Sequence, residues 1–122
     1  MAGQVVHLEI PADDTAAARG FWGSLFGWQF EAYPGPSEYH MTRLGEQQGG
    51  AITNAEAGKR GMRPFFDVDD INASLARVRE LGGEANDAMP VPSMGWFANC
   101  KDPHGNEFGF WQNDPSAPAP EM

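Results

Sequence analysis

The stretch VVHLEIPADDTAAARGFWGSLFGW at residues 5–28 places a strand, a helix cap and a helix in immediate succession. Residues 5–10 are rich in β-branched and apolar types, which is typical of a strand. An Asp-Asp pair ending at Asp14 is a good helix N-cap, and apolar side chains recur at helical spacing over 15–26. Gly27 supplies a helix stop. Three further strand candidates follow, at 28–33, 38–44 and 50–54.

The same order of elements starts again further along the chain, in FFDVDDINASLARVRELGG at 65–83. A shift of 56 residues places Asp70 on Asp14, and the same shift places Gly109 on Thr53. A constant offset across strand, cap, helix, stop and final turn indicates an internal repeat. In the second copy the strand candidates are 63–68, 84–88, 95–101 and 107–112, the last two joined by a turn at 102–106.

One such module leaves a face of its sheet bare, because its helix covers only the other face. We therefore expect an α+β fold in which two βαβββ modules form a half-barrel with a central cleft. The expected domain is a single one over residues 1–113, with modules of about 4–55 and about 61–113. The Pro- and Ala-rich residues 114–122 are predicted to be disordered.

Composition excludes several classes of function. The chain has 17 acidic against eight basic residues and a net charge of −9, so we expect no nucleic-acid partner. No apolar run is long enough for a membrane span, and the first residues do not resemble a signal peptide. The one cysteine, Cys100, has no intramolecular disulfide partner, which favours the cytoplasm and a buried structural thiol.

Strand alternation predicts which side chains face the cleft. His7 titrates near neutrality and could bind a ligand or move a proton, or it could be held by a neighbouring side chain. Arg63 could clamp an anion, or it could pair with Glu9 or Asp67. The side chains predicted to contact a ligand are His7, Tyr39, Met41, Arg63, Phe65, Trp96 and Trp111.

Together with MGWFANCKDPHGNEFGFWQ at 94–112, the two stretches quoted above resemble the vicinal oxygen chelate superfamily. That superfamily includes glyoxalase I, extradiol dioxygenases, fosfomycin-resistance enzymes and bleomycin-resistance proteins. The resemblance covers residues 4–113. It implies the glyoxalase/bleomycin-resistance/dioxygenase-like fold and a homodimer.

Enzymes of this superfamily hold a divalent metal at four positions, and the resemblance matches only the first of these, at His7. The other positions fall at Arg63, at Gly109 and near residues 52–54, where there is no acid. We therefore expect no cofactor. A divalent metal held with the help of Glu9 and Asp67 is the alternative.

The resulting hypothesis is a protein with a degenerate metal site that binds a small aromatic or anionic molecule in its cleft. The alternative is an enzyme, a glyoxalase-like lyase or an extradiol-dioxygenase-like oxidoreductase, with His7 and Glu9 as the catalytic candidates. A third possibility is a subunit whose cleft serves assembly.

Overall fold

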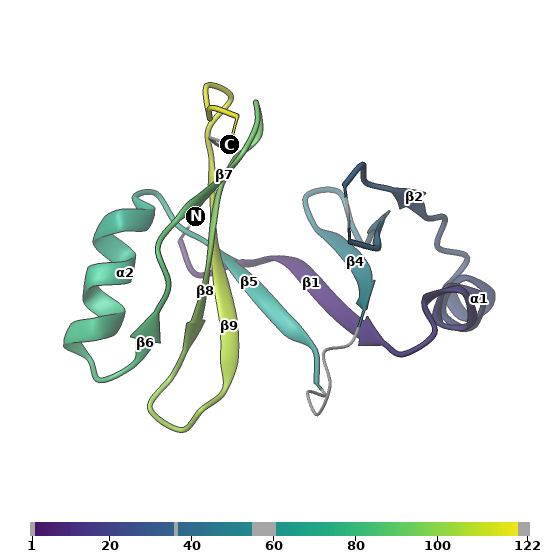
Figure 1. The fold of residues 1–122 in the computed structure, drawn as a ribbon, viewed down its shortest axis with the longest axis horizontal. Coiled ribbons are helices and arrows are strands. Elements are labelled where there is room, and N and C mark those ends of the chain that lie inside the picture. The colour runs from purple at the N-terminus through teal and green to yellow at the C-terminus, as the bar shows by residue number, and fades with distance from the viewer. Residues whose placement is uncertain (1, 36, 55–60, 120–122) are drawn as a thin grey trace. The chain divides into compact units, whose positions relative to one another are not determined.

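The computed structural model describes residues 2–35, 37–54 and 61–119 (Figure 1). The chain divides into two compact units. We call the residues from His7 to Arg63 the N-terminal module. The residues after Arg63, together with those before His7, form the C-terminal module.

The N-terminal module contains four hydrogen-bonded strands in the order β2-β3-β4-β1. Strand β1 pairs with β4 in parallel, while β4 with β3 and β3 with β2 are antiparallel. The helix α1 connects β1 to β2. The elements are β1 (Val5–Ala12), α1 (Thr15–Phe26), β2 (Glu31–Ala32), β3 (Tyr39–Arg43) and β4 (Gly49–Asn54).

The C-terminal module repeats this topology in the order β6-β8-β9-β5. Strand β5 pairs with β9 in parallel, β9 with β8 is antiparallel, and α2 follows β5 as α1 follows β1. A further strand, β7, pairs with β8 and was not predicted. The elements are β5 (Arg63–Asp67), α2 (Ile71–Glu80), β6 (Glu84–Ala85), β7 (Met89–Val91), β8 (Gly95–Lys101) and β9 (Glu107–Asn113). The predicted α+β fold of two duplicated modules is confirmed.

Both helices begin at the predicted aspartate caps. The carboxylate of Asp14 accepts a hydrogen bond from Ala17 N at 3.0 Å, and that of Asp70 accepts from Ala73 N at 3.1 Å. Each bond satisfies a backbone donor that the first helical turn leaves without a partner. Helix α1 ends at Gly27, whose φ of 74° lies in the left-handed region that glycine adopts without strain.

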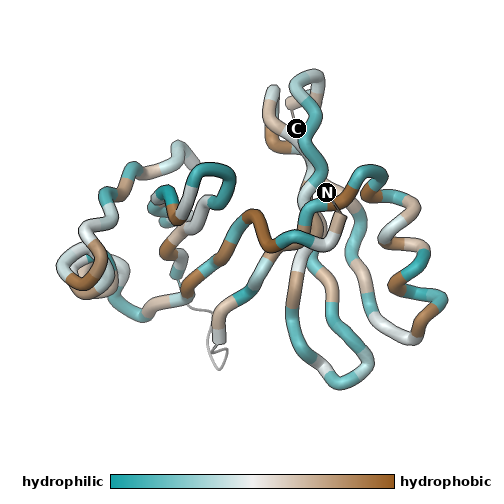
Figure 2. The backbone as a smooth tube through the Cα atoms, turned by 180° about the vertical axis from the view of Figure 1, so that it is seen from behind, coloured by the Kyte–Doolittle hydropathy of each residue, from teal (hydrophilic) through white to brown (hydrophobic). Residues whose placement is uncertain are grey.

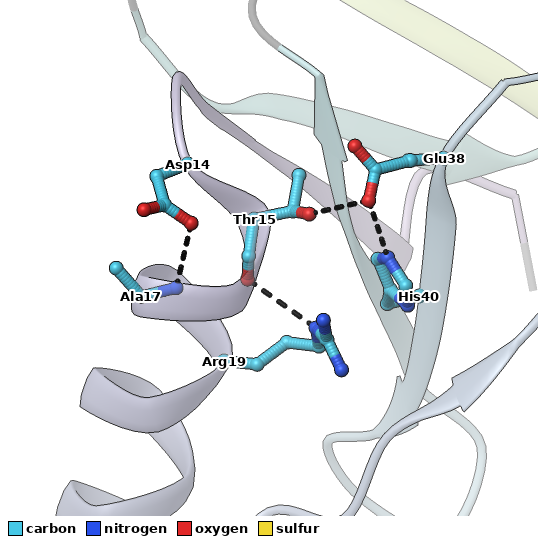
Figure 3. Close-up of polar contacts among 6 residues, drawn as sticks. All are labelled: Asp14, Thr15, Ala17, Arg19, Glu38 and His40. Atoms are coloured by element: carbon cyan, nitrogen blue, oxygen red, sulfur yellow. Dashed lines mark hydrogen bonds and ion pairs between the residues drawn. The ribbon is translucent and has the colours of Figure 1, made fainter.

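Side-chain contacts also hold the start of α1 against β3 (Figure 3). Thr15 Oγ1 donates to Glu38 Oε1 at 2.7 Å, and His40 Nε2 lies 3.3 Å from the same oxygen. Thr15 is 4% exposed, and its backbone carbonyl accepts a hydrogen bond from Arg19 Nε. These contacts position the first turn of the helix beside the sheet that carries the candidate site.

Each module has its own buried residues. In the N-terminal module Ile10, Ala51 and Ile52 are buried. In the C-terminal module α2 covers a core that contains Leu75 and Cys100, as expected for a structural thiol. Burial raises the pKa of Cys100 to about 11.

The tail departs in part from the disorder expected from its composition. Asp114 N donates to Met94 O at 2.9 Å, and Ser93 N donates to Ala117 O at 3.0 Å. Ala117 is 6% exposed. These contacts hold residues 114–117 on the turn between β7 and β8, while residues 120–122 lie outside the described residues.

Candidate functional site

Polar side chains from β1 and β3 meet on one face of the N-terminal sheet. His7 and Glu9 are two residues apart on β1 and therefore point to the same face. Strand β4 lies between β1 and β3, and the β4 residues paired with His7 and Glu9 are Gly49 and Ala51. Because these residues are small, the long side chains of β1 can reach across β4 to Tyr39 on β3.

The four residues of this polar cluster, His7, Glu9, Tyr39 and Arg63, form a continuous chain of contacts. The Tyr39 hydroxyl donates to Glu9 Oε2 at 3.1 Å. His7 Nε2 lies 2.6 Å from the same hydroxyl, and the two rings are stacked with an interplanar angle of 8°. The phenol proton is directed at Glu9, so His7 acts as the donor through Nε2–H. Arg63 Nη1 lies 3.5 Å from the other carboxylate oxygen of Glu9.

Burial sets the protonation of the polar cluster. It lowers the pKa of His7 to about 4, so the imidazole is neutral at pH 7. It raises the pKa of Glu9, against the opposing effects of the Tyr39 hydrogen bond and the Arg63 charge. It also raises the pKa of Tyr39, and the neighbouring Glu9 carboxylate adds to the shift. The cluster therefore contains two neutral groups, the His7 imidazole and the Tyr39 phenol, beside the ion pair of Glu9 with Arg63.

The other predicted contact residues divide between the modules. Met41 lies two residues from Tyr39 on β3 and shares its face. In the C-terminal module Phe65 is 4% exposed, and its ring occupies the space where a Cβ at Gly109 would lie. Trp111, two residues further along β9, covers Gly95.

Trp96 lies on the opposite face of its strand from the side chain of Trp111. Residue 96 packs against the core under α2, and its indole Nε1 donates to Asp114 Oδ2 at 3.0 Å. Strand β8 pairs Trp96 with Gln112 and Phe97 with Trp111, so Trp96 and Trp111 point to opposite faces. The length of the turn at 102–106 sets which residues of β8 and β9 are paired. It therefore also sets which side chains of the two strands share a face.

Two residues on the face of Trp111 were missed, Phe97 and Asn99. Both alternate with Trp96 along β8, and Asn99 is paired with Gly109. The Asn99 Oδ1 atom is buried and has no hydrogen-bond partner among the residues that the structure describes.

The strand register also corrects the predicted alignment of the two modules with each other. Strand β1 pairs Glu9 with Ala51, and strand β5 pairs Phe65 with Gly109. The equivalent of Gly109 is therefore Ala51 and not Thr53. The strand and helix of each module are related by 56 residues, whereas the following hairpins are related by 58. The C-terminal module thus contains two extra residues between its helix and its final hairpin.

Comparison with known proteins agrees with this topology. The sequence model of the Glyoxalase-like domain family matches residues 5–111. The chain belongs to this family. It is 31% identical over 114 residues to "Putative glyoxylase CFP32" of Mycobacterium tuberculosis, covering 86% of this chain but only 44% of that protein. It is 30% identical to a glyoxylase-like domain-containing protein of Didymella fabae, covering 85% of this chain and 89% of that one.

Solved structures of proteins with low sequence identity to this chain share the fold. A hypothetical protein from Bacillus halodurans C-125 has a TM-score of 0.73 at 12% identity, covering 96% of this chain and 99% of the other. Methylmalonyl-CoA epimerase from Mycobacterium tuberculosis has a TM-score of 0.66 at 16% identity, covering 97% and 89%. These likenesses confirm the fold, while the family match over residues 5–111 supports the predicted membership of the vicinal oxygen chelate superfamily. In the described part of the chain, neither helix has the length and apolar character needed to span a membrane.

The residues at the superfamily's metal positions do not form a complete donor set. His7 is bonded to Tyr39, Arg63 brings a positive charge, and Gly109 offers no side-chain donor. The ring of Phe65 occupies the space that a side chain at 109 would need. Among the residues that the structure describes, no three His, Cys, Asp or Glu side chains are grouped as a metal site. An arginine and a glycine are not residue types that ligate divalent metals, so among these three positions His7 alone has a side-chain donor for one.

Proposed function

We propose that this protein binds a small, partly anionic molecule with an aromatic or apolar part at the polar cluster, without a catalytic metal. The observation that carries this proposal is the hydrogen bond of 2.6 Å between His7 and Tyr39. His7 lies at the position that the resemblance assigns to the superfamily's first metal ligand, and this bond makes it part of a hydrogen-bond network within the protein. A single buried cysteine is compatible with our proposal of a cytoplasmic location.

The cluster contains one cation, Arg63, that a ligand anion could take over from Glu9. The side chains of Arg63 and Glu9 are only 24% and 20% exposed. A ligand carboxylate or carbonyl could accept from Arg63 and from the Tyr39 hydroxyl, and so replace the contacts that Glu9 makes now. Because burial already raises the pKa of Glu9, that carboxylate can take up a proton when the anion arrives. Met41 beside Tyr39 supplies an apolar surface for the rest of the ligand.

An enzyme is the second candidate function. The line of hydrogen bonds from His7 through Tyr39 to Glu9 could pass a proton between a bound molecule and a carboxylate whose pKa is raised. The relatives named as glyoxylases and the epimerase among the structural neighbours make this class relevant. A lyase or dioxygenase of the metal-dependent type would additionally require donors beyond His7.

The test combines metal analysis with ligand binding. Protein purified without chelators should contain well below one equivalent of divalent metal per chain. Calorimetric titration should show that benzoate binds and that benzyl alcohol, its uncharged analogue, binds more weakly. Arg63→Gln should weaken benzoate binding by at least about tenfold, because a charge-assisted hydrogen bond contributes roughly 1.5–3 kcal/mol. The matched control Arg77→Gln changes an exposed arginine on α2 and should leave the affinity unchanged.

Proton uptake by Glu9 gives a second readout. Benzoate affinity should rise as the pH falls towards the raised pKa of Glu9, and Glu9→Gln should flatten this dependence. Tight stoichiometric metal that His7→Ala removes would overturn the metal-free proposal and favour the enzyme. Equal benzoate affinity in Arg63→Gln and the wild type would show that the anion is not bound at the polar cluster.

A further inference from the structure

The sheet of the C-terminal module has one face that packs against α2 and one that does not. Ala98 and Cys100 of β8 belong to the core under α2. Phe97 and Asn99 alternate with them along the strand, so their side chains lie on the other face. This second face is built within the C-terminal module alone.

Strand pairing gathers aromatic rings on this second face. Strand β8 pairs Phe97 with Trp111 and Asn99 with Gly109, and strand β5 pairs Phe65 with Gly109. Figure 2 shows the turn of the β8–β9 hairpin as hydrophilic, with apolar segments in the strands above it. We call the four side chains of Phe65, Phe97, Asn99 and Trp111 the aromatic face.

The ring of Trp111 is fixed on this face as a flat surface. It lies over Gly95, where a Cβ would come within 2.7 Å of a ring atom. Its Nε1 donates to Asn113 Oδ1 at 2.8 Å. Trp111 is only partly buried, so the side of the indole turned away from Gly95 is available for stacking against another aromatic ring.

Gly109 leaves a hollow beside Asn99, because it has no side chain and the two residues are paired across the strands. In this structure the ring of Phe65 fills the hollow from β5. The ring would clash with any Cβ at this position, so the glycine is what allows it to lie there. When the Phe65 ring turns away, the hollow opens next to the Asn99 amide.

The side-chain oxygen of Asn99 is a buried acceptor without a donor. Its Oδ1 atom has no hydrogen-bond partner in the part of the chain that the structure describes. Buried polar atoms in folded proteins are nearly always hydrogen-bonded, so this acceptor requires an explanation. Asp67 lies on the same face, paired with Trp111, and its carboxylate disfavours an anion there. An acceptor beside a negative charge suits a ligand that donates a hydrogen bond and has no negative charge.

We propose that the aromatic face binds a neutral aromatic amide, whose ring stacks on Trp111 and whose N–H donates to Asn99 Oδ1. The Phe65 ring turns out of the hollow at Gly109 to admit the amide. Successive positions on one face of a strand are about 7 Å apart, which suits a ring that carries its amide directly. The site differs in module and in ligand charge from the anion site proposed at the polar cluster.

The test compares two probes of the same shape by calorimetric titration. Benzamide has an N–H donor, and acetophenone carries a methyl group in its place. The wild type should bind benzamide at least about tenfold more tightly, because a site that hydrogen-bonds a donor rejects the analogue that lacks it.

Substitutions at Asn99 separate a ligand contact from a structural role. Asn99→Leu keeps a similar size without the acceptor and should abolish the preference for benzamide. Its urea midpoint should not fall below that of the wild type, since the replaced acceptor has no partner to lose. Asn72→Leu makes the same change at an exposed position of α2 and should keep the preference. Asn99→Ala gives the same binding readout if circular dichroism shows that Asn99→Leu does not fold.

A variant of Phe65 tests the opposite direction. Phe65→Leu shortens the side chain that fills the hollow at Gly109, and it should bind benzamide several-fold more tightly than the wild type. Asn99→Leu in the same background should remove this gain, because the opened hollow then contains no acceptor.

Three outcomes would overturn the proposal. They are no benzamide binding by either the wild type or Phe65→Leu, equal wild-type affinity for benzamide and acetophenone, and a preference for benzamide that persists in the folded Asn99 variants. Arg63→Gln should keep the preference for benzamide, and Asn99→Leu should bind benzoate like the wild type. Failure at the aromatic face is therefore distinguishable from failure of the anion site at the polar cluster.

Discussion

Replacing His7 by glutamine should remove a large part of the pH dependence of stability. In the folded protein burial lowers the pKa of His7 to about 4, from an ordinary value of 6.5. The unfolded chain therefore binds more protons than the folded chain between these two pH values. Stability contributed by neutral His7 is fully present above pH 6.5 and is lost as the pH falls towards 4.

The size of the effect follows from the two pKa values. Linkage gives a loss of about 2 kcal/mol from His7 alone between pH 7.5 and pH 5.0. Glu9 acts in the opposite direction, because its raised pKa makes the folded state bind the extra proton. The glutamine amide of His7→Gln can still donate to the Tyr39 hydroxyl but does not titrate, so the difference between variant and wild type isolates His7.

The assay is urea unfolding followed by circular dichroism at the two pH values. The wild type should lose about 2 kcal/mol more than His7→Gln on going to the lower pH. His104→Gln removes a histidine from the exposed turn between β8 and β9 and serves as the control. Equal losses in the wild type and His7→Gln would refute the reasoning, since they would mean that His7 is not held neutral by burial.

Three further predictions concern packing, reactivity and capping. Gly109→Ala should lower the free energy of unfolding by about 1–3 kcal/mol in urea, because its Cβ would overlap the Phe65 ring. Cys100 should react with a thiol reagent at pH 8 only as fast as the protein unfolds, because burial raises its pKa to about 11; rapid labelling of the native protein would contradict this. Asp14→Ala should cost about 1 kcal/mol by losing the hydrogen bond to Ala17 N, measured by thermal unfolding against Asp13→Ala, which removes a neighbouring acid outside the cap.

Much of the local structure was predictable, because it depends on neighbouring residues. Helix α1 spans the predicted residues 15–26, and β8 spans the predicted 95–101. Strand β7 was missed because Pro90 and its short length give no alternating pattern, and it exists through pairing with β8. The tail residue Ala117 is buried, and its backbone carbonyl accepts a hydrogen bond from Ser93 N, a contact that no local sequence pattern predicts.

The candidate site was predictable in part. The ion pair of Arg63 with Glu9 is one of the two pairings that the sequence predicted for Arg63. The hydrogen bonds of Tyr39 to both β1 residues could not be predicted, because they depend on β4 lying between the strands with small residues. That Trp96 and Trp111 lie on opposite faces depends on the register of β8 against β9, which pairs Trp111 with Phe97.

The sequence by itself determined the duplicated modules and the two aspartate caps. Each of these is a matter of residue type and spacing along the chain. Only the tertiary structure decided that His7 is neutral, that Tyr39 joins it to Glu9, and that Phe21 and Leu25 are left exposed. The physical reason is that the burial of a side chain and its neighbours across the sheet depend on segments far apart in the sequence. Burial and neighbours in turn determine the pKa of His7, the hydrogen bonds of Tyr39 and the exposure of the α1 side chains.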